Sequence, residues 1–160
     1  ASGKSVVLKL FDVQERAARE CAILAELNSK SADTAPKLIE SDVLFVQGNA
    51  SIVLELGYEV PLFTARALQD DRGLLQRGNG YQLLLCVQAL HESCGKVHCD
   101  LKPEHFLHFE GRYRLIDYDT ALDMLQEVKS PPSTEGYTSP EVARAISVGG
   151  TVKITPAIDV

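Results

Sequence analysis

Apolar residues alternate with polar ones, or recur at helical spacing, along most of this chain. Alternation predicts a strand at residues 5–11, and the 3.6-residue period that follows predicts a helix at 12–28. Two pairs of short apolar runs, each around a turn, predict hairpins at 43–56 and 106–116. The segment 81–92 is apolar almost all round, which predicts a helix buried inside a larger body. We also expect short helices at 62–68 and 141–146, the start of a helix at 157–160, and loops at 29–36, 69–80 and 130–134.

Two charged residues interrupt otherwise apolar faces. Lys9 points the same way as Val7 and Phe11 in the first strand, and Glu20 lies within the apolar stripe of the first helix. Lys9 either extends its ammonium to water or is partly enclosed beside a partner. Glu20 either reaches solvent at the edge of the stripe or is paired, because an unpaired buried carboxylate is costly. Taken together, the two anomalies favour an ion pair between Lys9 and Glu20.

Composition narrows the class of protein. With 160 residues, the chain has the size of one domain or of a part of one. Its 45% apolar and 24% charged residues are typical of a soluble globular chain, and no apolar run approaches the roughly 18 residues of a membrane span. A net charge of −6 argues against a nucleic-acid partner. Because no secretory signal is present and the four cysteines lie mostly in apolar or helical segments, we expect reduced thiols in a cytoplasmic or otherwise intracellular protein.

The most informative chemistry lies in residues 98–105 (His-Cys-Asp-Leu-Lys-Pro-Glu-His) and 115–119 (Leu-Ile-Asp-Tyr-Asp). Asp100 and Asp117 lie at the ends of apolar segments, with the second hairpin between them. This arrangement lets both carboxylates face one pocket, where one orients a hydroxyl and the other holds a divalent metal. The pattern suggests phosphoryl transfer.

A zinc site is an alternative use of the polar residues in this region. His91, Cys94, His98 and Cys99 are all residue types that bind zinc. Their spacing, however, spans a helix end and a loop, and the adjacent side chains of His98 and Cys99 diverge. We expect His91 to pack at the end of the apolar helix and His98 to fix the following loop by hydrogen bonds.

These elements, in this order, resemble the protein kinase family. Any one motif is weak, but six in sequence with sensible spacing make the resemblance specific. They are Lys9, Glu20, the hairpin and connector at 52–57 with the apolar helix after it, and residues 98–103, 117–119 and 137–141 (Tyr-Thr-Ser-Pro-Glu).

The resemblance implies an α+β, two-lobe protein-kinase-like fold, of which residues 1–160 cover part of the domain. It places a portion of the β-rich lobe at about 1–56, the hinge at 57–61 and a portion of the helical lobe at 62–160. It also implies that the rest of the parent polypeptide supplies the glycine-rich strands before residue 5 and the remaining helices after residue 160. ATP and a protein substrate are the implied partners, and Mg²⁺ is the implied cofactor.

Catalytic roles follow from the same resemblance. Asp100 is expected to accept or orient the proton of the substrate hydroxyl, and Lys102 to stabilise charge on the transferred phosphoryl group. Asp117 is the expected Mg²⁺ ligand. Lys102 with Pro103 favours a Ser/Thr kinase over a Tyr kinase, and residues 137–141 favour a protein substrate over a small molecule.

The nucleotide-binding roles also come from the resemblance. Lys9 is expected to contact the α- and β-phosphates of ATP, with Glu20 holding it in place. Leu54 corresponds to the gatekeeper, and the backbones of Glu55 and Gly57 are expected to hydrogen-bond adenine. Asp159 corresponds to the aspartate that holds the catalytic loop through its backbone.

Three positions depart from the family. Cys99 replaces the arginine that receives an activation-loop phosphate, so Ser130, Ser133 and Thr134 lack an obvious local cation and we expect no phosphoregulation there. His105 replaces the asparagine that is the second metal ligand, which leaves a one-metal site, a preference for Mn²⁺ or lost catalysis as alternatives. Asp119 replaces a glycine; we expect it to tolerate a left-handed backbone but to repel ATP unless it binds metal. An active kinase and a nucleotide-binding or scaffolding pseudokinase are therefore both compatible with the sequence.

Overall fold

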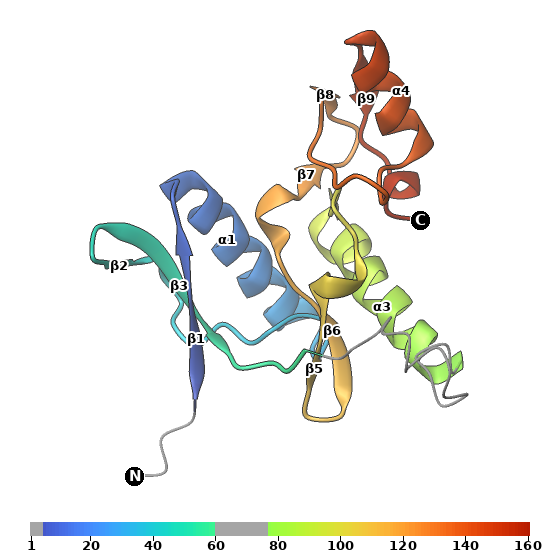
Figure 1. Ribbon diagram of the computed structural model, residues 1–160. Coiled ribbons are helices and arrows are strands. Elements are labelled where there is room, and N and C mark those ends of the chain that lie inside the picture. Colours follow the sequence, from blue (N-terminus) through green and yellow to red (C-terminus); the bar gives the residue numbers. More distant parts are fainter. Residues whose placement is uncertain (1–4, 60–76) are drawn as a thin grey trace.

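A three-stranded antiparallel sheet and one long helix form the first part of the molecule (Figure 1). The computed structural model describes residues 5–59 and 77–160. Strand order is β1-β3-β2, and α1 packs across β3 with its buried leucines against Ile52 and Leu54. The expected first strand, first helix and first hairpin are confirmed. Their bounds are β1 Val6–Phe11, α1 Gln14–Lys30, β2 Leu44–Val46 and β3 Asn49–Glu55.

A second hairpin and a long helix extend this core. The hairpin of β5 (Phe106–Phe109) and β6 (Arg112–Leu115) lies against α3 (Arg77–Cys94), and α3 also packs on α1. Both hairpins turn on a residue followed by glycine, Gln47-Gly48 and Glu110-Gly111, with positive φ at both positions. This is the backbone that a two-residue turn needs to match the twist of its strands.

The structure corrects two expectations for α3. Residues 77–80 belong to the helix rather than to a loop. The helix is also not buried all round: Tyr81 and Leu84 are 62% and 66% exposed. Within the described part of the chain, α3 packs mainly on α1, β6 and the short strand β4 (Lys96–Val97). The helix expected at 62–68 and most of the loop expected at 69–80 lie outside the described residues.

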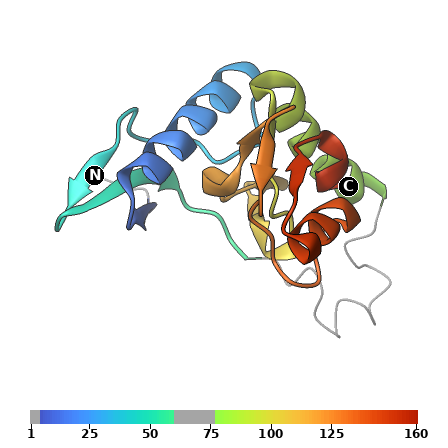
Figure 2. The same cartoon turned by 90° about the horizontal axis from the view of Figure 1, so that it is seen from above.

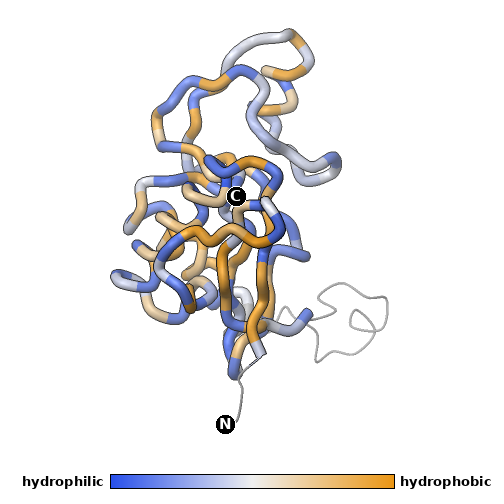
Figure 3. The backbone as a smooth tube through the Cα atoms, turned by 90° about the vertical axis from the view of Figure 1, so that its left-hand side faces the viewer, coloured by the Kyte–Doolittle hydropathy of each residue, from blue (hydrophilic) through white to orange (hydrophobic). Residues whose placement is uncertain are grey.

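A second, smaller hydrophobic core lies near the C-terminus and includes the buried side chains of Val97, Val142 and Ile154. Seen from above, the β1–β3 sheet and helix α4 (Pro140–Val148) lie at opposite ends of the molecule (Figure 2). Colouring by hydropathy shows hydrophobic stretches in both parts of the chain, with hydrophilic turns between them (Figure 3). The elements here are β4 Lys96–Val97 paired with β7 Leu122–Asp123, β8 Glu127–Lys129 paired with β9 Thr151–Lys153, α4 Pro140–Val148, and the 3₁₀ turns η1 Pro103–His105, η2 Tyr118–Thr120 and η3 Pro156–Asp159.

Local chemistry explains where α4 begins and ends. Ser139 caps its N-terminus by accepting from the backbone of Val142, and Pro140 occupies the first turn, where its missing N–H costs nothing. Gly149 ends the helix in the left-handed conformation.

The element order confirms the expected α+β architecture with a β-rich first part. All four cysteines are free, and no helix in the described residues has the length and apolar character to cross a bilayer.

Candidate active site

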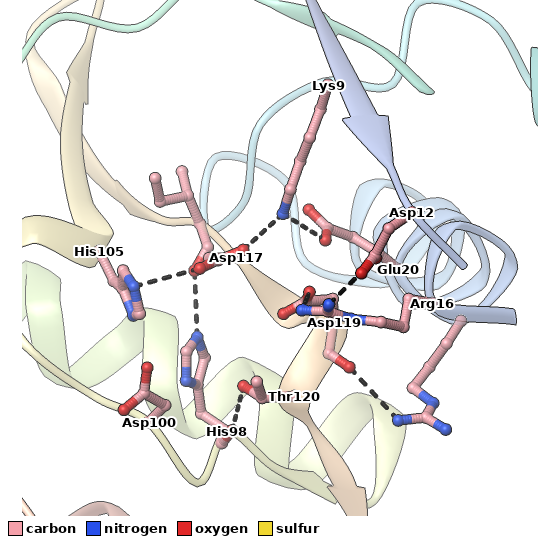
Figure 4. Close-up of polar contacts among 12 residues, drawn as sticks. Lys9, Asp12, Arg16, Glu20, His98, Asp100, His105, Asp117, Asp119 and Thr120 are labelled. Atoms are coloured by element: carbon pink, nitrogen blue, oxygen red, sulfur yellow. Dashed lines mark hydrogen bonds and ion pairs between the residues drawn. The ribbon is translucent and has the colours of Figure 1, made fainter. Parts of the chain in front are cut away.

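An ion-pair network links β1, α1 and the segment after β6 (Figure 4). The ammonium of Lys9 lies 2.6 Å from Glu20 Oε2 and 2.5 Å from Asp117 Oδ1. Lys9 is therefore enclosed beside partners rather than extended to water. Burial acts to lower the pKa of Lys9, but Glu20 and Asp117 together raise it, so the ammonium stays charged. Burial raises the pKa of Glu20 to about 7, against the opposing effect of Lys9.

Asp117 is shared between this network and a pair of buried histidines. Its second oxygen lies 3.2 Å from Nε2 of His105, and its backbone is left-handed, with φ 69° and ψ 59°. The hydrogen bond from His105 lowers the pKa of Asp117, and Lys9 adds to the effect. The ring of His98 is fully buried 5.3 Å from that of His105, and its Nε2 contacts the carbonyl of Ile116 at 3.0 Å. The ring of His98 thus fixes the backbone just before Asp117, whereas the sequence led us to expect it to fix the loop that follows His98 itself.

A threonine hydroxyl joins Asp100 and Lys102. Thr134 Oγ1 donates to Asp100 Oδ1 at 2.6 Å, while Lys102 Nζ lies 3.1 Å from both Asp100 Oδ2 and Thr134 Oγ1. Burial acts to raise the pKa of Asp100, but the hydrogen bonds from Thr134 and Lys102 outweigh it and lower that pKa. Asp100 is therefore ionised at neutral pH with a hydroxyl already in contact. The expectation that Thr134 lacks a local cation is wrong, because Lys102 is that cation.

Asp159 holds the loop that carries Asp100. Its fully buried carboxylate accepts from the backbone N–H of His98 at 2.8 Å and of Cys99 at 2.9 Å, and it also contacts Nε2 of His91 at 2.8 Å. These bonds support a left-handed backbone at Cys99, where φ is 69°. The aspartate expected from the family resemblance to organise this loop makes that contact here.

A cavity of about 360 Å³ opens beside the Lys9 network. Its lining includes every residue expected to contact the nucleotide or its metal, except His105. Asp100 and Lys102 do not line it; Asp100 lies on the side of Asp117 away from Lys9 (Figure 4). The lining residues that carry the argument are Lys9, Glu20, Leu54, Glu55, Gly57 and Asp117.

The connector after β3 is bonded to the second hairpin. Tyr58 exchanges two backbone hydrogen bonds of 3.0 Å with His108, and the ring of Phe109 packs directly against Gly57. Arg114, 2% exposed, pairs with Glu55 and lies 3.1 Å from Asp33. The connector is therefore a fixed wall of the cavity.

Asp119 behaves differently from the sequence-based expectation. It lies within the 3₁₀ turn η2, and the left-handed residue is Asp117 instead. Its carboxylate is buried against Arg16 of α1, and its carbonyl accepts from Arg19 at 3.3 Å. A cation therefore balances the charge that was expected to repel ATP.

The zinc alternative gains no support from the geometry. His91 contacts Asp159, His98 contacts Ile116, and Cys99 Sγ lies 3.5 Å from the carbonyl of Val97. Across residues 5–59 and 77–160, the one cluster of three or more possible metal ligands is Glu20, Asp117 and Asp119.

Comparison with known proteins agrees with this arrangement. The profile described as "Protein kinase domain" matches residues 1–160. The chain belongs to the protein kinase family. One relative is "Protein kinase dsk1" of Schizosaccharomyces pombe, which is 41% identical over 59 residues. Those residues are 37% of this chain and 9% of the relative, so the match spans less than a tenth of that protein's length.

Three residues of the kinase site were not singled out for these contacts by the sequence. Arg16, Arg19 and Arg114 are charged residues in amphipathic or strand segments, where solvent exposure is the usual outcome. Alternation along β6 gave no signal for Arg114 either, because it places Arg114 on the same face as the exposed Arg112. Thr134 was noted only as a possible phosphorylation site.

Proposed function

We propose that this domain transfers the γ-phosphoryl group of ATP to a serine or threonine hydroxyl of a protein substrate, with Mg²⁺ as the cofactor. The contact between Asp100 and the Thr134 hydroxyl is the observation that carries the proposal. An ionised carboxylate 2.6 Å from a threonine hydroxyl, with the Lys102 ammonium 3.1 Å from both, is the environment that a substrate hydroxyl requires. Thr134 stands in for that substrate hydroxyl and would be displaced by it.

The chemistry assigns each step to a residue. Asp100 accepts the proton as the substrate oxygen forms its bond to the γ-phosphorus, and the bond to the bridging oxygen breaks to release ADP. Lys102 stabilises the charge that develops on the transferred group. Lys9, oriented by Glu20, binds the α- and β-phosphates. Leu54 and the backbones of Glu55 and Gly57 form the adenine wall of the cavity, with residues 57–61 as the hinge between portions 1–56 and 62–160.

The donor set fits one divalent ion better than two. Asp117 offers hard carboxylate oxygens, which Mg²⁺ prefers, and the ion would neutralise charge on the phosphates. His105, the candidate second ligand, offers a softer nitrogen that suits Mn²⁺ better, and its Nε2 already faces Asp117 at 3.2 Å. We therefore assign Asp117 as the principal metal ligand, and His105 as a ligand only if Mn²⁺ replaces Mg²⁺.

Transfer of radiolabel from [γ-³²P]ATP by the full-length protein tests the proposal. Wild-type protein should label a serine- or threonine-containing acceptor, and Asp100→Asn should abolish labelling while leaving binding of an ATP analogue unchanged. The Asn side chain keeps the size of Asp but cannot accept the proton. Labelling that persists in Asp100→Asn would refute the assignment.

A nucleotide-binding pseudokinase is the second candidate. The observation that favours it is that both oxygens of Asp117 are engaged, one by Lys9 and the other by His105. Under this hypothesis, ATP raises the melting temperature of the protein by mass action, but no label is transferred with either Mg²⁺ or Mn²⁺.

A further inference from the structure

Asp119 connects the segment around Asp117 to α1 by a second route. Its carboxylate, 6% exposed, forms an ion pair with Arg16, and its backbone oxygen accepts from Arg19. Both arginines belong to α1, the helix that carries Glu20 (Figure 4). Two polar connections therefore join the same pair of elements. One runs from Glu20 through Lys9 to Asp117, and the other runs directly from the arginines to Asp119.

The charges show why the second connection matters. The carboxylates of Glu20, Asp117 and Asp119 offer oxygens within 4.8 Å of one another. Lys9 contacts two of them but not Asp119. Like charges this close repel strongly in a partly buried site. The guanidinium of Arg16 supplies the compensating charge for Asp119 and holds the N-terminal half of α1 over η2 as it does so.

We propose that Asp119, Arg16 and Arg19 form a clamp that positions α1 against η2, so that Glu20 and Asp117 stay aligned on Lys9. Asp119 is then a positioning residue for the proposed phosphoryl transfer, and the inference rests on that function. The clamp uses only side chains and backbone of this chain and needs no phosphate on residues 130–134. The clamp therefore explains how the Lys9 network is assembled in a chain that has Cys99, and not a phosphate-binding arginine, beside Asp100.

The same three carboxylates could instead bind a cation. The two hypotheses differ in what Arg16 does. In a clamp, Arg16 supports the geometry and its removal lowers activity. In a metal site, Arg16 competes with the ion, so its removal strengthens divalent binding and Asp119→Asn weakens it.

Amide hydrogen exchange and steady-state kinetics on the full-length protein test the clamp. Arg16→Gln and Asp119→Asn should each raise exchange rates in the first turns of α1 by about tenfold, the factor that corresponds to about 1.4 kcal/mol. Each should lower kcat by a similar factor with a smaller change in KM for ATP, because alignment rather than the cavity is affected. The double variant should be no worse than the more damaged single variant, since both changes remove one interaction.

Glu26→Gln is the matched control, because it removes an exposed pair with Lys30 on the same helix. It should leave exchange and kinetics unchanged. The exchange measurement needs no catalysis, so an inactive wild-type protein would refute the proposed function while still testing the clamp. Unchanged exchange in both Arg16→Gln and Asp119→Asn, or additive effects in the double variant, would overturn it. Tighter Mn²⁺ binding by Arg16→Gln would assign the cluster to a metal.

Discussion

Replacing Gly57 by alanine tests the close packing of the connector on the second hairpin. A Cβ at this position would lie 2.4 Å from Cζ of Phe109 and within 2.8 Å of two more ring atoms. Carbon atoms pack best at about 3.5–4.0 Å, so the ring must retreat by roughly 1 Å or more. It has little room to do so, because Phe109 is 2% exposed and the Arg114 guanidinium lies 5.1 Å from its ring centre.

Overpacking of this kind costs about 1–3 kcal/mol. We expect Gly57→Ala to lower the free energy of unfolding by about 2 kcal/mol in urea titrations. Because Gly57 and Phe109 both line the cavity, binding of an ATP analogue should weaken as well. Calorimetric titration with a non-hydrolysable analogue measures that second effect.

A matched glycine gives the opposite expectation. Gly80 lies within α3, and a Cβ there meets nothing within 4 Å. Gly80→Ala should therefore stabilise the protein by about 0.5–1 kcal/mol. Adding Phe109→Leu to Gly57→Ala replaces the ring by a smaller side chain, so the double variant should recover much of the analogue binding that Gly57→Ala loses. A Gly57→Ala protein within about 0.3 kcal/mol of wild type would refute the contact.

Three further predictions concern the catalytic loop and its charges. Thr134→Glu should abolish phosphoryl transfer, because a second carboxylate would face Asp100 and would pair with Lys102. Thr134→Ser keeps the hydroxyl and should retain activity. A Thr134→Glu protein more active than wild type would contradict this geometry. Asp159→Ala should destabilise the fold by about 3 kcal/mol in urea titrations, since it leaves two buried N–H groups without acceptors, and a loss below 1 kcal/mol would disprove that role. The pKa of Asp117 is lowered from 3.8 in the folded state, so its contribution to stability is fully present above that value and is lost as pH falls below it. In acid-induced unfolding followed by circular dichroism, Asp117→Asn should accordingly show a shallower dependence on pH than wild type, and identical slopes would exclude Asp117 as the cause.

The sequence predicted elements whose signal is local. The first strand, first helix and both hairpins follow from periodicity and from turn residues, and the structure confirms them. The strands β4, β7, β8 and β9 were missed because each has only two or three residues, which is too short to show a period of two. The exposed side of α3 was misjudged because an apolar sequence reports what a helix could bury, not which neighbours it has.

For the candidate site, the sequence indicated which residues are unusual but did not reveal all of their contact partners. The sequence showed that Lys9 and Glu20 are charged residues on otherwise apolar faces, and an ion pair is the least costly way to bury both charges. Nothing local revealed that Asp119 would meet Arg16, because the two residues are 103 positions apart and depend on how α1 packs over η2. The family resemblance likewise suggested a left-handed backbone at Asp119, but the positive φ is at Asp117, whose carboxylate contacts Lys9 and His105.

The carboxylate of Asp159 also has a consequence for the order of events on the ribosome. It lies 61 residues beyond His98 and 60 beyond Cys99, the residues whose N–H groups it accepts from. A nascent chain that has emerged through η2 contains every residue of the Lys9 network, yet the loop that carries Asp100 still lacks the carboxylate of Asp159. Under the proposed function, the loop that carries Asp100 therefore takes its final shape only after residue 159 has emerged, so shorter nascent chains would bind nucleotide before they could transfer phosphate.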